Sequence, residues 1–143
     1  MKKNLLYTLL LTLFTAIVFT ACNKDTAGAE TSLSYRMLSD KTWYLDYAQT
    51  ITGTTVKTKT YVGQSTYFIN FLKNLTTVDS DGITGTYSVE KINSQLQIHV
   101  QAKTSNGSSL EYIYDIESMG DKNMVLTYKS GAVTTKLFYS NKK

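Results

Sequence analysis

The segment "SQLQIHVQAKTSNGSSLEYIYDIES", residues 94–118, alternates apolar and polar residues on both sides of a short polar turn. Its first half places three apolar residues in one phase: Leu96, Ile98 and Val100. Its second half repeats the pattern with Leu110, Tyr112, Tyr114 and Ile116. A period of two places these residues on one face of a strand, and Asn106-Gly107 is a strong turn signal. The segment therefore predicts a β-hairpin with one apolar face.

The same alternation recurs along the chain from about residue 40. It predicts further strands over residues 42–49, 54–62, 66–72, 75–79, 83–89, 123–129 and 132–140. Gly, Asn and Asp separate these runs, and the chain contains no proline to interrupt a ladder of hydrogen bonds. A helical pattern is confined to residues 31–39, where Leu33, Met37 and Leu38 share a face.

Eight or nine short strands in sequential hairpins, each with one apolar face, need to bury only one side of their sheet. Closing such a meander on itself removes its edges. We therefore expect an all-β fold over residues 35–143, an antiparallel up-and-down meander closing into an eight-stranded barrel, preceded by a short N-terminal helix. The interior of such a barrel is filled by side chains or holds one small ligand.

The N-terminus has the pattern of a signal peptide over residues 1–21. Lys2 and Lys3 precede an apolar run from Leu5 to Phe19, which is shorter than the roughly 20 residues of a spanning helix and ends in small residues. Cys22 follows and is the only cysteine of the 143 residues. A lone cysteine forms no internal disulfide, so we expect a domain without disulfides.

The stretch Phe19-Thr20-Ala21-Cys22 resembles a bacterial lipobox. The resemblance implies cleavage before Cys22, diacylglycerol on its sulfur, and a lipid anchor in the cell envelope, in the outer membrane on its periplasmic face or at the cell surface. An uncleaved membrane anchor and an ordinary secretory signal with an incidental cysteine are the alternatives. Cleavage removes two lysines and no acid, so the net charge of +4 falls by two. Neither net charge is high, and the sequence has no basic cluster, so nucleic-acid binding is not expected.

Residues 22–34 are small and polar, which predicts a flexible tether between the lipid and the barrel. Lys24-Asp25 resembles part of a surface-export signal of Bacteroidetes. Asp25-Thr26-Ala27 is similar to a short O-glycosylation motif of the same phylum, which would place a glycan on Thr26. The alternative is a plain solvated linker.

The stretch "LSDKTWYLDY", residues 38–47, carries the only tryptophan, Trp43, at the start of the first strand. Together with the helix before it and the meander after it, it resembles the lipocalin-like lipoproteins of Bacteroidetes, within the calycin group. In lipocalins a tryptophan at this point packs at the closed end of the barrel, often beneath a helix, and Trp43 matches it. Lys41 replaces the glycine that usually stands two residues earlier. The resemblance implies a barrel and often a hydrophobic ligand.

Tyrosine is abundant, with eleven residues in the chain. Six lie on the inferred inward phase of their strands: Tyr47, Tyr87, Tyr112, Tyr114, Tyr128 and Tyr139. Because a buried tyrosine needs a partner for its hydroxyl, they imply a hydrogen-bonded core or a small cavity with polar tips on apolar walls. The candidate ligand-binding residues are Trp43, Tyr47, Tyr87, Tyr112, Tyr114 and Tyr128.

The residues that would carry catalysis or hold a metal are sparse. His99 is the only histidine, and it lies on the polar phase of its strand. Three acidic residues, Glu111, Asp115 and Glu117, lie opposite the apolar phase of theirs. Residues 79–90, "DSDGITGTYSVE", lack the ligand and glycine that a calcium loop needs at its fifth and sixth positions, and they predict a hairpin instead. We expect a monomer that is not an enzyme and that holds no metal or cofactor.

Two functions from different classes fit these observations. The first is binding of a small apolar or amphipathic molecule inside the barrel, without catalysis. The second is a filled barrel that contacts a protein or glycan through its loops, near residues 63–65, 80–82 and 105–109.

Overall fold

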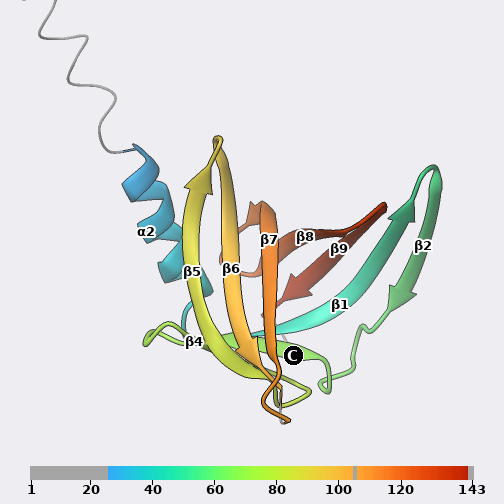
Figure 1. Cartoon of the computed structure of the whole chain (residues 1–143), viewed down its shortest axis with the longest axis horizontal. Coiled ribbons are helices and arrows are strands. Elements are labelled where there is room, and N and C mark those ends of the chain that lie inside the picture. The colour runs from blue at the N-terminus through green and yellow to red at the C-terminus, as the bar shows by residue number, and fades with distance from the viewer. Residues whose placement is uncertain (1–25, 105, 142–143) are drawn as a thin grey trace, which may run out of the picture. The chain divides into compact units, whose positions relative to one another are not determined.

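The computed structural model describes residues 26–104 and 106–141. Cys22 and the expected signal peptide lie outside them. In chain order the elements are α2 (Thr26–Leu38), β1 (Lys41–Thr52), β2 (Thr55–Thr60), β3 (Phe68–Phe71), β4 (Thr76–Asp79), β5 (Thr84–Ile92), β6 (Gln95–Lys103), β7 (Ser109–Met119), β8 (Asn123–Ser130) and β9 (Val133–Ser140) (Figure 1).

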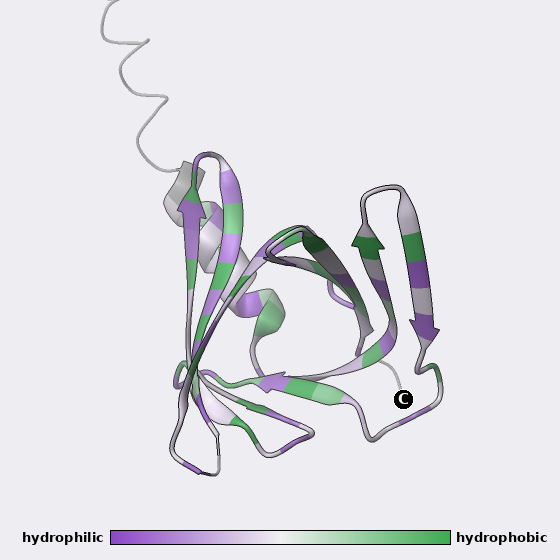
Figure 2. Ribbon diagram, turned by 45° about the vertical axis from the view of Figure 1, so that its right-hand side comes forward, coloured by the Kyte–Doolittle hydropathy of each residue, from purple (hydrophilic) through white to green (hydrophobic). Residues whose placement is uncertain are grey.

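The strands form one antiparallel sheet in the order β2-β1-β3-β4-β5-β6-β7-β8-β9, and β1 also pairs with β9. This last pairing closes an eight-stranded barrel from β1 and β3 to β9 (Figure 2). The expected fold class, an eight-stranded antiparallel barrel with a short N-terminal helix, is confirmed. The ninth strand, β2, pairs only with β1 among the described strands.

One edge of β1 pairs with two different strands. Residues 41–44 pair with β3, and residues 47–52 pair with β2. The β1–β2 hairpin therefore extends beyond the ring of strands, and all six residues of β2 are exposed. Lys57 and Lys59 lie on this free strand, and lysines on an edge discourage pairing with another chain.

A β-bulge reverses the faces of β1. Leu45 lies opposite Tyr139 of β9, but Tyr47 lies opposite Phe138, so Asp46 is an extra residue. Beyond the bulge every side chain moves to the other face. Tyr47 consequently stacks on Phe138 on the outside of the barrel, with ring centroids 4.3 Å apart. The inward phase expected for Tyr47 is wrong for this reason.

The C-terminal half of α2 lies across one end of the barrel (Figure 2). Leu38 of the helix, Trp43 of β1 and Phe71 of β3 are all fully buried there. The indole Nε1 of Trp43 donates to the carbonyl oxygen of Leu38 at 3.1 Å. The hydroxyl of Tyr35 accepts from the backbone N–H of Val89 at 2.7 Å, which joins α2 to β5. We call this end of the barrel the closed end.

The helix begins at Thr26, five residues before the expected start at residue 31. Residues 26–34, expected to be part of a flexible tether, are thus helical, and Ala29 and Glu30 are favourable helix formers. The compact unit that contains the barrel begins at Thr31 and therefore also includes the end of α2. Among the described residues, none of the helices has the length and apolar character needed to cross a membrane.

Gly85 allows β5 and β6 to approach closely. A Cβ atom added at this residue would lie 2.3 Å from the carbonyl oxygen of Gln101 and 2.7 Å from the Cα of Ala102. Only glycine avoids this overlap with the neighbouring backbone, and a glycine in a strand often marks such a close approach.

Candidate functional site

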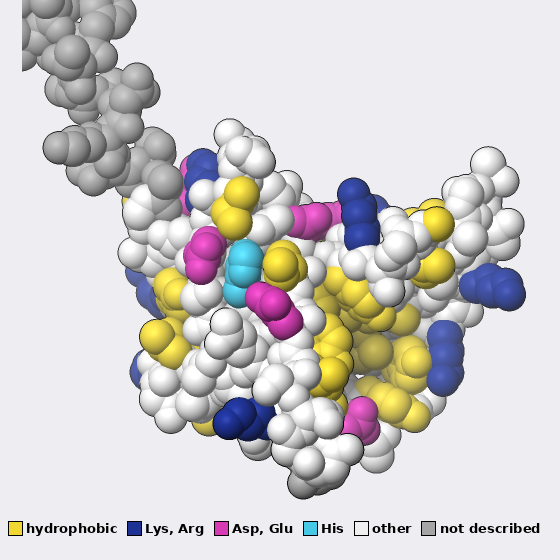
Figure 3. All heavy atoms as spheres, in the orientation of Figure 1, with side chains coloured by type: hydrophobic (Ala, Val, Ile, Leu, Met, Phe, Trp, Pro, Cys, Tyr) yellow, Lys and Arg dark blue, Asp and Glu magenta, His cyan; other side chains and the backbone are white. Residues whose placement is uncertain are grey.

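A cavity of about 210 Å³ occupies the half of the barrel opposite α2. Its lining residues are Ile69, Thr77, Asp79, Asp81, Ile83, Val100, Ala102, Tyr112, Tyr114, Tyr128 and Leu137. Figure 3 shows hydrophobic side chains in the hollow between β7 and the β1–β2 hairpin. The volume equals that of about seven water molecules in the liquid, which is sufficient for a small organic molecule.

Three tyrosines on two strands form one wall of this cavity. Tyr112 and Tyr114 of β7 stack with ring centroids 6.0 Å apart, and Tyr114 meets the ring of Tyr128 of β8 edge-on at 5.7 Å. The rest of the lining is mostly apolar and includes Ile69, Val100 and Leu137. The cavity therefore offers aromatic faces and hydroxyl groups within a mostly apolar surround.

Burial disfavours ionisation of two tyrosines inside the barrel. It raises the pKa of Tyr114 and of Tyr139 far above the ordinary value of tyrosine, and the negative charge of Asp79 adds to the rise in both. Both hydroxyls, which are neutral near pH 7 like those of ordinary tyrosines, therefore keep their proton to a higher pH.

Asp79 both stabilises the turn between β4 and β5 and lines the cavity. Its Oδ1 accepts hydrogen bonds from the backbone N–H groups of Asp81 at 2.9 Å and Ile83 at 3.0 Å, which fixes the turn between β4 and β5. Asp79 is partly buried, whereas Asp81 is exposed at the rim. No lysine, arginine or histidine is among the described residues that line the cavity.

The barrel wall is split beside the cavity. β7 pairs with β8 only from Asp115 to Met119, so residues 109–114 have no partner on β8. A second hollow of about 360 Å³ lies at this split and is lined by Glu111, Tyr112, Ile113, Tyr128, Lys129 and Ser130. Because Tyr112 and Tyr128 line both hollows, they stand between the interior and the outside.

The structure brings together three of the six residues predicted to bind a ligand: Tyr112, Tyr114 and Tyr128. Trp43 and Tyr87 point inward as expected, but they pack in the core toward the closed end and line no part of the cavity. The Tyr87 hydroxyl donates to the carbonyl oxygen of Leu72 at 3.1 Å, and its ring meets Phe71 edge-on. Tyr47 lies on the outer face, as described above.

The two charged residues of the cavity were not predicted to bind a ligand. Asp79 and Asp81 belong to the segment that the sequence analysis interpreted as a hairpin, and β4 and β5 do form one there. The signal that could have found Asp79 is its spacing from Thr77, a buried residue two positions earlier on β4 that also lines the cavity. Thr26, the predicted glycosylation residue, is the first residue of α2, and its modification stays a prediction.

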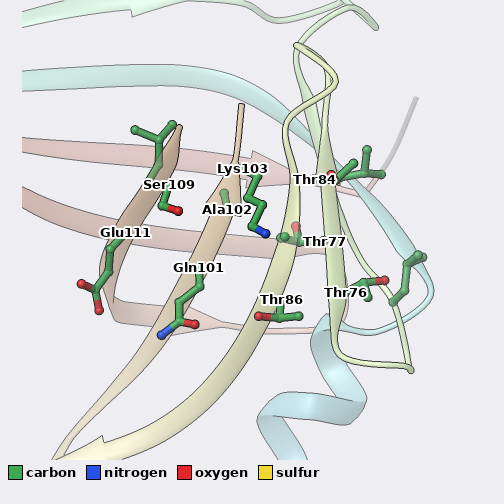
Figure 4. A pocket seen from close by; sticks show the side chains of 13 residues that line it. Thr76, Thr77, Thr84, Thr86, Gln101, Ala102, Lys103, Ser109 and Glu111 are labelled. Atoms are coloured by element: carbon green, nitrogen blue, oxygen red, sulfur yellow. The ribbon is translucent and has the colours of Figure 1, made fainter. Parts of the chain in front are cut away.

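A larger groove of about 900 Å³ lies on the outside of β4 to β7. Figure 4 shows polar side chains from four strands around it, among them Thr84, Gln101 and Glu111. The groove is open to solvent and has no aromatic residue among its lining residues. It therefore lacks the enclosing apolar and aromatic surfaces typical of small-molecule sites.

The candidate acid–base residues are also on the outer face and bond to their neighbours. His99 is 3.2 Å from the side-chain oxygen of Gln97, whose amide nitrogen donates to Asp115 at 2.8 Å. Glu117 accepts hydrogen bonds from Thr127 and Lys136, and the contact with Lys136 lowers its pKa. Among the described residues, no group of three or more His, Cys, Asp or Glu side chains could hold a metal ion.

The fold and this site define a class of structure, a closed β-barrel with a small tyrosine-walled and acid-rimmed cavity. No family model matches the chain, and neither the curated proteins nor the solved structures contain a match.

Proposed function

We propose that this protein is a non-enzymatic, lipid-anchored, lipocalin-like barrel of the cell envelope that binds a small apolar or amphipathic molecule in its interior cavity. The observation that carries the proposal is the cavity itself. Apolar walls, three tyrosines and a neighbouring hollow at the split between β7 and β8 occur together, away from the closed end.

Binding would depend mainly on burial of apolar surface against Ile69, Val100 and Leu137. Each Å² of apolar surface removed from water contributes roughly 25 cal/mol to the free energy of binding. The tyrosine hydroxyls would orient the polar end of the ligand, since a polar group that enters the barrel needs a hydrogen-bond partner. The split between β7 and β8 gives a route of entry past Tyr112 and Tyr128.

The lipid anchor rests on the sequence around Cys22, which lies outside the described residues. Replacement of Cys22 by Ala tests it. The variant precursor should incorporate no labelled fatty acid and should leave the membrane fraction, whereas the wild type should incorporate the label and stay in that fraction. Acyl labelling that persists in the variant would refute the lipobox interpretation.

Native mass spectrometry of the protein purified from its host tests binding in the cavity. We expect the wild type to carry a bound mass that Val100→Phe loses, because Val100 is buried and lines the cavity. His99→Phe is the matched control, since His99 is the preceding residue of β6 and lies on the outer face. Leu137→Phe, from β9, provides a second cavity-filling variant in case Val100→Phe does not fold.

The alternative, a filled barrel that acts through its loops, has one observation in its favour. The loop after β2 exposes Val62 and Tyr67, and Gly63 to Ser65 line a small hollow with Tyr44 and Tyr61. If the wild type carries no bound mass, or if both Phe variants retain it, binding inside the barrel is contradicted and this surface becomes the better candidate.

A further inference from the structure

We propose that the cavity selects a ligand with a positively charged nitrogen, that is, a small organic amine with an apolar body. This inference rests on the proposed function, because it assumes that the cavity binds a ligand, and it adds the chemical class of that ligand.

The charge of the lining is the first argument. Asp79 and Asp81 are the two charged residues among the described residues that line the cavity, and both are acidic. Asp40, Glu117 and Asp121 form ion pairs with lysines elsewhere in the protein. The two backbone N–H groups that Asp79 binds both reach Oδ1, which leaves its second oxygen for another donor. An ammonium group would donate a charge-assisted hydrogen bond, which is roughly twice as strong as a neutral one.

The aromatic wall is the second argument. Tyrosine rings attract a cation over their faces, and the attraction is larger where water is excluded. The cavity that Asp79 lines is also lined by three tyrosines whose rings contact one another: Tyr112, Tyr114 and Tyr128. Tyrosine hydroxyls are neutral near pH 7, and burial raises the pKa of Tyr114 further, so this wall adds hydrogen-bonding groups without adding a competing negative charge.

The same residues oppose an anionic ligand. A carboxylate in this cavity would meet the negative charge of Asp79 and no lysine, arginine or histidine among the described lining residues. A buried charge without a partner is costly, so a fatty acid or other acid is disfavoured. The volume of about 210 Å³ limits the apolar body to a single ring or a short alkyl chain.

Three probes with one apolar body separate these alternatives: 2-phenylethylamine, 2-phenylethanol and phenylacetate. Isothermal titration calorimetry at neutral pH and low ionic strength measures their affinities for the full barrel domain. We expect the amine to bind at least about tenfold more tightly than the alcohol, the difference that one charge-assisted hydrogen bond supplies. Phenylacetate should bind most weakly.

Variants locate the source of the preference. Asp79→Asn keeps an oxygen for the two backbone N–H groups of the turn and removes the charge, so it should fold. Combined with Asp81→Asn it should lower the affinity for the amine about tenfold and leave that for the alcohol unchanged. Asp121→Asn is the control, because Asp121 pairs with Lys41 outside the cavity and its loss should change neither affinity.

Each outcome bears on a different claim. Equal affinities for the amine and the alcohol, both lost in Val100→Phe, would overturn the selection for charge and leave cavity binding intact. A preference that survives in the double Asn variant would show that Asp79 and Asp81 are not its source and would also overturn the inference. If none of the three probes binds at millimolar concentration, both the selection for an amine and the proposed binding inside the cavity are contradicted.

Discussion

The indole nitrogen of Trp43 donates a hydrogen bond to the carbonyl oxygen of Leu38 at 3.1 Å, and both side chains are fully buried. Leu38 is the last residue of α2, and the final carbonyl groups of a helix have no partner within it. The bond therefore satisfies a helix end and joins α2 to β1 in the same contact.

Replacement of Trp43 by Phe should destabilise the barrel by about 2–4 kcal/mol. The change leaves the buried Leu38 carbonyl without its donor and opens space in a filled core. Urea unfolding followed by circular dichroism measures the loss. Tyr44→Phe is the control, since Tyr44 lies on the other face of β1 and its ring packs edge-on against Phe68. Equal losses in the two variants would contradict the role assigned to Trp43.

Removal of the Tyr35 hydroxyl should loosen α2 from β5. The N–H of Val89 donates to this hydroxyl, so Tyr35→Phe leaves a buried donor unpaired at a cost of about 1–3 kcal/mol. Hydrogen exchange should show faster exchange at the Val89 amide than in the wild type. Tyr47→Phe, which removes a hydroxyl from the outer face, should leave this amide protected. Unchanged exchange at Val89 in Tyr35→Phe would exclude the contact.

A methyl group at residue 85 should be poorly tolerated. Gly85→Ala places a Cβ atom 2.3 Å from the Gln101 carbonyl oxygen, so β5 and β6 must move apart at a cost of more than about 2 kcal/mol. Gly120→Ala is the matched control, because a Cβ at Gly120 would meet the Asn123 carbonyl oxygen at an ordinary 3.9 Å. Thermal or urea unfolding of the two variants should differ accordingly, and similar midpoints would speak against the close approach.

The barrel should lose stability at alkaline pH. Burial raises the pKa of Tyr114 and Tyr139 above the value of 10.0 for an unperturbed tyrosine. The folded protein then holds two protons that the unfolded chain releases, so their stabilisation is complete below pH 10 and declines as the pH rises above it. Urea midpoints measured from about pH 8 to about pH 12 should fall at the alkaline end.

Variants identify the groups responsible for that fall. Tyr139→Phe removes one raised pKa and should make the decline less steep, whereas Tyr47→Phe should retain the steepness of the wild type. If the stability of Tyr139→Phe falls as steeply with pH as that of the wild type, other groups control the alkaline transition.

Most of the barrel was predictable because its strands follow a strict period of two. The alternation in β5, β6 and β7 places Tyr87, Val100 and Tyr112 inward, as the sequence predicted. The exceptions are two irregularities: in β1 one extra residue, Asp46, reverses the faces, and β7 shifts register between Ile116 and Ser118. The bulge is a property of the pairing of β1 with β9, a strand almost a hundred residues away, and the local pattern around Tyr47 does not report it.

The site was predictable only in part, because alternation gives the face of a residue and not its position along the barrel axis. Trp43 and Tyr87 face inward like Tyr114, yet they pack toward the end that α2 covers. That position depends on the stagger of the strands and on the helix, which begins earlier than its apolar pattern. Asp79 was missed since its residue type suggested a turn, and it serves both the turn and the cavity.

The position of Trp43 also gives the protein a built-in optical probe. It is the only indole of the chain, so all tryptophan emission comes from one fully buried point beneath α2. The tyrosines of the cavity wall absorb at shorter wavelength and can transfer their excitation to it. A ligand that contacts Tyr112 or Tyr128 would alter this transfer without touching Trp43. Occupancy of the cavity and integrity of the closed end can therefore be followed separately, in one unlabelled sample, by the choice of excitation wavelength.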